Sequence, residues 1–179
     1  MAPTVDGTPP TPCWTSGRRP ATHGAATTLA RRYFTAFGPA TGADFTTWSG
    51  LPSTRAIALI RDELSPVDVG GRPGYRLGEA SPQSGLRLLP AFDNYLVGYR
   101  DRSSIIDPAV VAQVYIGGII RPSVLLDGRV VGTWRIGPGK ATTRVDVTLF
   151  EDLPRKAQRA LDAEIADVGR FLGTPTTAD

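Results

Sequence analysis

The sequence predicts an α+β protein, with a winged helix followed by a small antiparallel β-barrel or curved sheet with packed helices. Three observations predict this class. Helical periodicity dominates the first part, two alternating segments around a Gly-rich turn follow it, and a second group of alternating segments ends in a long amphipathic helix. The 179 residues are 41% hydrophobic and 21% charged, which is typical of a chain that folds around its own core.

We expect three segments along the chain. Residues 1–23 contain five prolines among Thr and Gly without a hydrophobic period, which predicts a flexible Pro/Thr-rich tail. Residues 24–80 form the predicted winged-helix domain, and residues 81–179 form a β-barrel-like domain with a C-terminal helix. The boundary falls in the Gly/Ser/Pro-rich stretch 78–85.

The winged-helix segment begins with three predicted helices. The first starts near Gly24 and ends at Gly38, and its apolar face comprises Ala26, Leu29, Ala30, Tyr33, Phe34 and Phe37. Thr41-Gly-Ala-Asp44 has the form of a capping box and opens the second helix, which Gly50 ends. The third helix is expected from Pro52 to about Leu64, with Ser53, Thr54, Arg55 and Arg61 facing outward.

A hairpin is predicted after these helices, with strands 67–69 and 75–77 around the turn 70–74. Three helices followed by a hairpin is the winged-helix order, in which the third helix enters the major groove. The predicted nucleic-acid-binding residues of this unit are Ser53, Thr54, Arg55, Arg61, Arg72 and Arg76. The alternatives are plain helical packing and a winged helix that serves only as a protein-contact module.

The stretch Leu86–Arg102 is predicted to form two buried strands joined by a turn at Asp93 and Asn94. It ends in the triplet Arg100, Asp101, Arg102. In a strand, the two arginines point to the same face and could clamp a phosphate. Alternatively, they pair with Asp101 or with Asp62 and Glu63 as surface ions.

The remaining chain supplies sheet and helix signals. A short helix is predicted from Asp107-Pro108 to Tyr115, and Asp127-Gly128 predicts a type I′ hairpin between strands 123–126 and 129–136. An alternating strand follows over 144–149, and an amphipathic helix begins near Pro154.

The sequence lacks the residues that most catalytic mechanisms require. His23 is the single histidine and Cys13 the single cysteine, so we expect no histidine-dependent catalytic triad, no disulfide, no metal site and no cofactor. Paired carboxylates are the weak catalytic candidates, because Asp93 and Asp101 could activate a water for glycosidic cleavage. The favoured interpretation is that Asp93 holds a turn and that neighbouring arginines lower the pKa of Asp101.

Aromatic residues suggest a ligand pocket. Asn94, Tyr99 and Trp134 could line a site for an extruded base or a small aromatic ligand, although aromatics in a small barrel are more often core.

The charge balance favours an anionic partner. The formal net charge is +3, and nearly all cations are Arg, with Lys only at positions 140 and 156. A high-GC coding bias would produce the same composition. Cysteine scarcity favours a cytoplasmic location, and the longest uncharged apolar run, 108–120, is shorter than a membrane span, so we expect no membrane partner.

Several motifs resemble one bacterial family. They are Tyr33-Phe34, Phe37-Gly-Pro-Ala-Thr41, Leu88-Leu-Pro-Ala-Phe-Asp-Asn94, Tyr99-Arg-Asp-Arg102 and Val124-Leu-Leu-Asp-Gly-Arg-Val-Val-Gly-Thr-Trp134. Over residues 24–174, the chain resembles the C-terminal half of the winged-helix DNA-binding family that includes the AlkZ and YcaQ type DNA glycosylases. The resemblance implies several winged helices and a barrel in full-length members, and removal of bulky alkylated or crosslinked bases, in some members as self-resistance.

The resemblance does not carry the catalytic element over. The family's Gln-x-Gln motif lies in the N-terminal half, and no two of Gln83, Gln113 and Gln158 are two residues apart. Three functions therefore stay open. The chain is a double-stranded DNA-binding module, a small-molecule or natural-product self-resistance protein with the barrel as pocket, or part of a split glycosylase whose partner chain supplies the N-terminal half.

Overall fold

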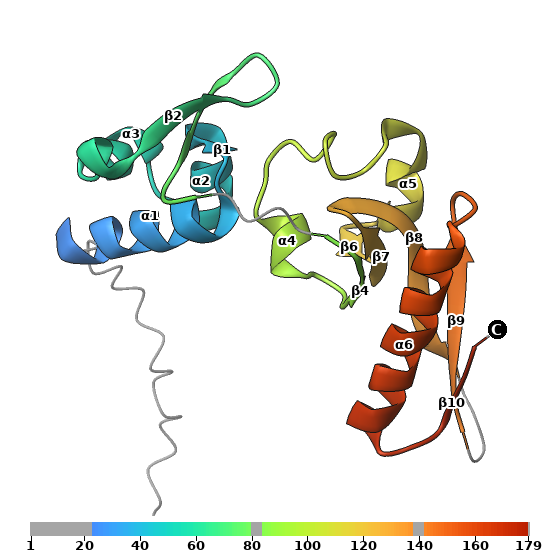
Figure 1. The fold of residues 1–179 in the computed structure, drawn as a ribbon. Helices are drawn as coiled ribbons and strands as arrows, with labels where there is room; N and C mark the ends of the chain where they lie inside the picture. The colour runs from blue at the N-terminus through green and yellow to red at the C-terminus, as the bar shows by residue number, and fades with distance from the viewer. Residues whose placement is uncertain (1–22, 80–83, 138–141, 179) are drawn as a thin grey trace, which may run out of the picture.

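A computed structural model describes residues 23–79, 84–137 and 142–178, and Figure 1 shows its elements. Residues 1–22 of the predicted tail lie outside the described residues, whereas His23 is already the first residue of helix α1. The predicted boundary between residues 80 and 81 falls in an undescribed stretch and stays a prediction. Within the described residues, no helix is long and apolar enough to span a membrane.

The first part of the chain forms a layer of short helices. They are α1 (His23–Phe37), α2 (Gly42–Ser49), α3 (Ser53–Ala58) and the 3₁₀ helix η1 (Arg61–Glu63). The predicted apolar face of α1 is confirmed, because Tyr33 and Phe34 are fully buried with Phe45 of α2. The Tyr33 ring meets the Phe34 and Phe45 rings edge-on at centroid distances of 5.2 and 5.4 Å. Such edge-to-face contacts favour one fixed arrangement of the helices.

The start of α2 follows its sequence signal. Thr41 accepts a hydrogen bond from the Asp44 backbone N–H at 3.2 Å, and Asp44 accepts one from the Thr41 backbone N–H at 2.8 Å, so the predicted capping box is confirmed. The predicted third helix is too long, because α3 ends at Ala58 and the chain continues through η1. Ile60 and Leu64, which lie within the predicted range, are nevertheless buried.

The predicted hairpin is confirmed after these helices. Strand β2 (Ser65–Asp68) pairs antiparallel with β3 (Pro73–Arg76), and β3 also pairs with the short strand β1 (Ala40–Thr41). Gly70 and Gly71 in the turn adopt φ values of 59° and 77°, a region that favours glycine. The order of three helices followed by a hairpin is therefore present.

The second part is built on an open five-stranded sheet. Its spatial order is β10–β9–β8–β7–β4, from strands β4 (Leu86–Leu89), β7 (Ser123–Leu126), β8 (Arg129–Gly137), β9 (Thr143–Leu149) and β10 (Thr176–Ala178). Edge strands β4 and β10 do not pair with each other, so the described residues form no closed barrel. Of the two predicted alternatives, the barrel is wrong, and an open sheet with a packed helix is present. The sheet is also not purely antiparallel, because β10 runs parallel to β9.

The β7–β8 hairpin matches its sequence signal. Asp127 and Gly128 have φ values of 48° and 85°, as a type I′ turn requires at both central residues. The predicted strand over 144–149 lies within β9.

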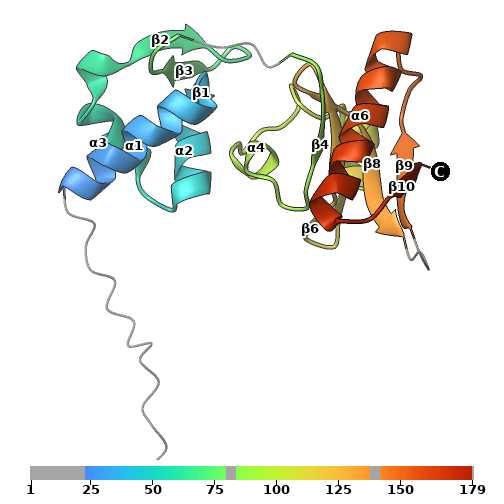
Figure 2. The same ribbon diagram turned by 60° about the horizontal axis from the view of Figure 1, so that its bottom comes forward.

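Helix α6 (Arg155–Leu172) covers one face of this sheet, as Figures 1 and 2 show. Its buried stripe of Ala157, Leu161 and Ile165 packs against sheet residues that include Val131 and Val145. The same helix protects the open edge, because Glu164 accepts a hydrogen bond from the Leu88 backbone N–H at 3.1 Å.

One predicted strand is a helix instead. Residues Asn94–Val97 form α4, and the Asp93 carboxylate caps it by accepting a hydrogen bond from the Tyr95 N–H at 2.8 Å. The apolar run that suggested a strand is too short for periodicity to distinguish the two, and the Asp93 cap decides for a helical turn.

The next predicted helix is also shorter than expected. It divides into the 3₁₀ helix η2 (Pro108–Val110) and α5 (Val111–Val114), and Tyr115 already belongs to strand β5 (Tyr115–Ile116). Strand β5 pairs with β6 (Ile119–Ile120) around Gly117 and Gly118, which therefore form a hairpin turn.

The segment after α4 docks onto the helical layer. The Tyr33 hydroxyl donates to the Gly98 carbonyl oxygen at 2.7 Å, and the Tyr99 hydroxyl donates to the Phe37 carbonyl oxygen at 2.9 Å. Both views in Figures 1 and 2 place α4 between this layer and the sheet. We call residues 98–102 the docking segment.

The docking segment requires glycine at position 98. A Cβ there would lie 2.7 Å from the Phe37 ring and 2.9 Å from the Asn94 carbonyl oxygen. We predict that Gly98→Ala lowers the free energy of unfolding by about 1–3 kcal/mol, the usual cost of overpacking. Chemical denaturation measures this change.

The matched control is Gly24→Ala near the start of α1, where a Cβ would meet nothing within 4 Å. This variant should leave stability unchanged or slightly raised, because alanine restricts the unfolded chain. Equal stability of both variants would contradict the tight docking of Gly98.

Candidate nucleic-acid interface

Three arginines that the sequence predicts to contact DNA line one cleft. Arg72 comes from the β2–β3 turn, and Arg100 and Arg102 come from the docking segment. The cleft has a volume of about 550 Å³. Its other lining residues are Asp101, Ser103, Ile106, Pro108, Val111 and Tyr115. The cleft thus combines an excess of positive charge with apolar surface.

Asp101 forms an ion pair with one of these arginines, Arg72. Its carboxylate accepts a hydrogen bond from Arg72 at 2.8 Å, and both side chains are about half exposed. The backbone and side chain of Ser103 hydrogen-bond to the carboxylate and, with the Arg72 charge, lower the pKa of Asp101. The expected direction of this pKa shift is therefore correct, but its causes are Ser103 and Arg72 and not the flanking arginines.

Arg102 is held against the protein. Its guanidinium donates to the Leu96 carbonyl oxygen and lies 5.1 Å from the centre of the Tyr115 ring, a cation–π distance. The strand that was expected to point Arg100 and Arg102 to the same face does not exist, because residues 100–102 belong to no strand. The irregular docking segment nevertheless brings both residues to the same cleft.

Arg100 is the most available cation of the three. Its backbone N–H donates to Asp44 at 2.8 Å, whereas its side chain is exposed and has no ion-pair partner among the described residues. An Arg side chain presented from a fixed backbone can form bidentate hydrogen bonds with a phosphate.

Asp44 is a residue that sequence reasoning missed as part of this site. The capping box identified its bonds to Thr41, but its second carboxylate oxygen accepts from Arg100, 56 residues further along the chain. The side chain is only 3% exposed. No local pattern in the sequence indicates this long-range contact.

A second cavity lies next to the cleft. It has a volume of about 310 Å³ and is lined by Asp44, Tyr95 and Tyr99 among others. It shares Arg72, Asp101 and Ser103 with the cleft, so the Arg72–Asp101 pair belongs to both walls.

The weak catalytic pair is not brought together. Asp93 caps α4, whereas Asp101 binds Arg72 and the Ser103 N–H. The carboxylates thus serve different local contacts, and the cavities that contain Asp101 do not include Asp93.

The predicted pocket residues also separate. Tyr99 lies in the 310 Å³ cavity, and Asn94 is exposed at the start of α4. Trp134 lies in β8, packs against the α6 core and donates from its indole N–H to the Leu89 carbonyl oxygen at 2.8 Å. These three side chains therefore do not share one of the cavities described above.

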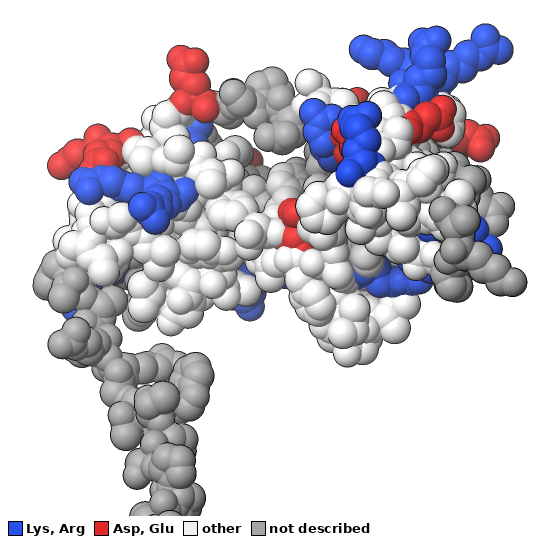
Figure 3. All heavy atoms as spheres, turned by 90° about the horizontal axis from the view of Figure 1, so that it is seen from below, with Lys and Arg blue, Asp and Glu red and all other residues white. Residues whose placement is uncertain are grey.

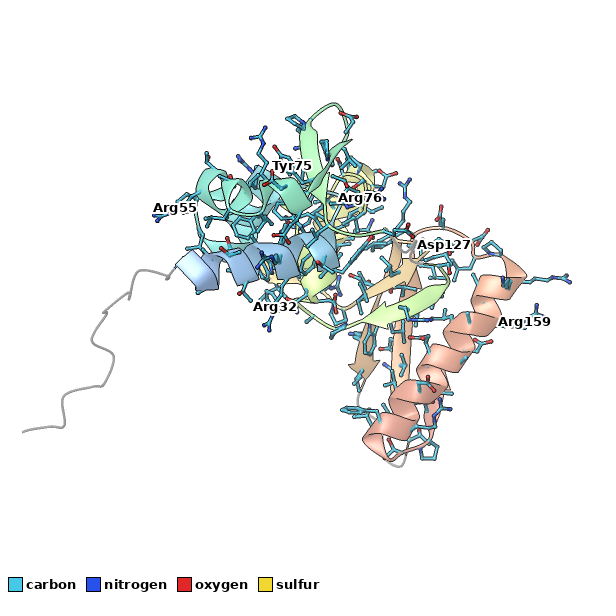
Figure 4. All side chains as sticks on the ribbon, turned by 60° about the vertical axis from the view of Figure 1, so that its left-hand side comes forward. Arg32, Arg55, Tyr75, Arg76, Asp127 and Arg159 are labelled. Atoms are coloured by element: carbon cyan, nitrogen blue, oxygen red, sulfur yellow. The ribbon has the colours of Figure 1, made fainter. Side chains whose placement is uncertain are left out.

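The remaining predicted DNA contacts lie on the helical layer. Thr54, Arg55 and Arg61 are exposed, and Ser53 and Arg76 are half-buried. Figure 4 shows Arg55 at the outer side of α3, with Arg76 on the side nearer the sheet. Figure 3 shows one face of the molecule on which basic and acidic groups are interspersed with uncharged surface. That face carries no continuous basic band. The arginine cleft is therefore a better candidate for a DNA contact than the charge distribution over that face.

Metal ligands do not cluster in the part of the chain that the structure describes, where no group of three or more His, Cys, Asp and Glu side chains could hold a metal ion.

The fold and cleft define a mixed helix–sheet protein with an arginine-lined surface site. The family model for AlkZ-like DNA glycosylases matches residues 1–171. The chain therefore belongs to the AlkZ-like DNA glycosylase family, as the sequence motifs suggested.

Both a curated relative and a solved structure from Streptomyces sahachiroi are similar to this chain. An interstrand DNA cross-link repair glycosylase is 35% identical over 174 residues, which cover 88% of this chain and 45% of the relative. The solved structure of the DNA glycosylase AlkZ matches with a TM-score of 0.69 and 32% identity, over 88% of this chain and 46% of that one. The chain thus spans about half the length of the relatives it matches.

Tyr99, the half-buried tyrosine of the docking segment, should make stability depend on pH. Burial, then the neighbouring Tyr95 and Asp44, raise the pKa of Tyr99 to about 12 from 10. Between these pH values the unfolded phenol loses its proton while the folded one keeps it. The free energy of unfolding should therefore fall as pH rises from 10 to about 12.

Denaturation midpoints across this range measure the loss, and Tyr99→Phe should show a shallower decline. Tyrosinate absorbance of the native protein gives the independent check. A single transition of all five tyrosines near pH 10 would contradict the burial of this hydroxyl.

Proposed function

We propose that this chain binds double-stranded DNA through the arginine cleft and acts as the DNA-positioning C-terminal part of a DNA glycosylase for bulky or crosslinked lesions. The observation that carries the proposal is the convergence of Arg72, Arg100 and Arg102 on one cleft with a single carboxylate. Arginine forks match phosphate geometry, and phosphate contacts supply most of the affinity of DNA-binding proteins.

In this proposal, the helical layer also contacts DNA, beside the arginine cleft. Helices α1–α3 and the β2–β3 hairpin would act as a winged helix, with Ser53, Thr54, Arg55 and Arg61 contacting DNA from the region of α3. Arg76 lies on the same hairpin as Arg72. The support is the order of elements together with the exposure of Thr54, Arg55 and Arg61.

Base release is the second candidate function. The 35% identical relative is named an interstrand DNA cross-link repair glycosylase, and this relationship supports the proposal that this chain contributes to base release as one half of a glycosylase. This chain has no Gln-x-Gln sequence, so we propose that it does not cleave alone. Incubation with alkylated DNA, with and without a chain that carries Gln-x-Gln, separates a split glycosylase from a pure binding module.

The structure weakens the alternative that the chain binds a small molecule in a barrel pocket. The open sheet removes the barrel pocket on which it depended. The 310 Å³ cavity with Tyr95 and Tyr99 supports a reduced form of this alternative, because it contains aromatic side chains and its volume is in the range of small-ligand pockets. Tyrosine fluorescence titrations with planar aromatic compounds test this smaller site.

Removal of Arg100 tests DNA binding. We predict that Arg100→Ala lowers the affinity for a duplex about threefold to tenfold and reduces the salt dependence of binding by about one released counterion. Fluorescence anisotropy of a labelled duplex at several salt concentrations measures both quantities.

Arg159→Ala is the matched control, because Arg159 is an exposed cation on α6, away from the cleft (Figure 4). It removes the same charge and should change affinity much less. Equal losses in both variants would indicate general electrostatic attraction, and absence of duplex binding by the unmodified chain at low salt would end the proposal.

A further inference from the structure

The Arg72–Asp101 ion pair links two parts of the cleft that are separately built. Arg72 lies in the β2–β3 turn, whereas Asp101 lies in the docking segment. The pair also stands between the two cavities, since both residues line the 550 Å³ cleft and the 310 Å³ cavity. A change in this pair therefore alters both spaces at once.

Asp101 is the fixed partner. Its carboxylate accepts the Ser103 N–H at 3.0 Å, and the preceding residue is tied to Asp44 through its backbone. Tyr99 anchors the same segment to the Phe37 carbonyl oxygen. The negative charge therefore remains at the cleft wall whether or not Arg72 is present.

Arg72 is the exchangeable partner. Its side chain is 47% exposed, and it extends from a turn that contains Gly70 and Gly71. Water surrounds much of this pair, and exposed ion pairs contribute little net stability. The contact between the two residues is a single hydrogen bond, from Arg72 Nη2 to Asp101 Oδ2. A phosphate can therefore replace the Asp101 carboxylate on the guanidinium with little loss, because its oxygens can accept two hydrogen bonds from the guanidinium fork.

We propose that Asp101 is an internal substitute for a DNA phosphate, which holds Arg72 in the free protein and releases it when duplex DNA enters the cleft. This inference rests on the proposed DNA-binding function and names the residue that limits its affinity. Asp101 opposes binding in two ways, because it occupies an arginine and places a negative charge beside the incoming phosphate.

Exchange of partners also changes the shape of the site. When Arg72 turns toward DNA, the wall between the cleft and the tyrosine-lined cavity opens. Tyr95 and Tyr99 then border the same groove as the phosphate-binding arginines. Asp101 thus couples phosphate binding to access to this cavity.

The test is a double-mutant cycle in the complete chain. Duplex binding is measured by fluorescence anisotropy for the unmodified protein, Asp101→Asn, Arg72→Gln and the double variant. Asp101→Asn should raise affinity about threefold to tenfold, and Arg72→Gln should lower it by a similar factor. In the Arg72→Gln background, Asp101→Asn should give less than half of its effect, because no arginine is left to release.

The matched control is Asp167→Asn. Asp167 is an exposed aspartate on α6 that pairs with Arg170, so the substitution makes the same change in charge and also breaks an ion pair. Its effect on DNA affinity should be less than twofold. Circular dichroism and denaturation midpoints confirm that each variant is folded.

Two results would overturn the inference while DNA binding itself stands. One is an equal gain from Asp101→Asn with and without Arg72, and the other is an equal gain from Asp167→Asn, since either would show only a change in net charge. If the unmodified chain fails to bind duplex at low salt, the proposed function fails and this inference fails with it.

Discussion

The contact between the docking segment and the helical layer is the interaction on which the rest of the structure depends. The buried Asp44 carboxylate caps its own helix and accepts the Arg100 N–H, while two tyrosine hydroxyls bridge the same surfaces. Buried polar groups that satisfy each other in this way strongly specify one arrangement, because separating them leaves unpaired donors and acceptors. Gly98 permits the close approach against Phe37.

This contact determines where the charges of the cleft lie. Arg100 and Arg102 have no strand to orient them, so their positions follow from the docked backbone, from Leu96 and from the Tyr115 ring. The β2–β3 turn, which belongs to the helical part of the chain, adds Arg72 to the cleft. Each of the three arginines therefore starts from a defined position in the backbone, as a binding site built on a stable scaffold requires.

Local signals in the sequence predicted much of the fold. The α1 face, the Thr41–Asp44 box and the Asp127-Gly128 hairpin depend on neighbouring residues, and each is present. Sheet closure and the parallel strand β10 depend on long-range pairing, which periodicity does not report. The strand predicted after the Asp93–Asn94 turn was wrong because a short apolar run fits either structure. The site was found only in part because the Asp44–Arg100 contact spans distant positions.

The central claim is that DNA binds at the cleft beside the docking segment. Chemical-shift mapping tests it most directly, with the isotope-labelled chain titrated with a short duplex. We predict that the largest amide shifts occur at residues 69–72 and 100–103 and at Tyr115, with little change along the exposed face of α6. Shifts concentrated on α6, with the amides around the cleft unchanged at saturation, would contradict this placement.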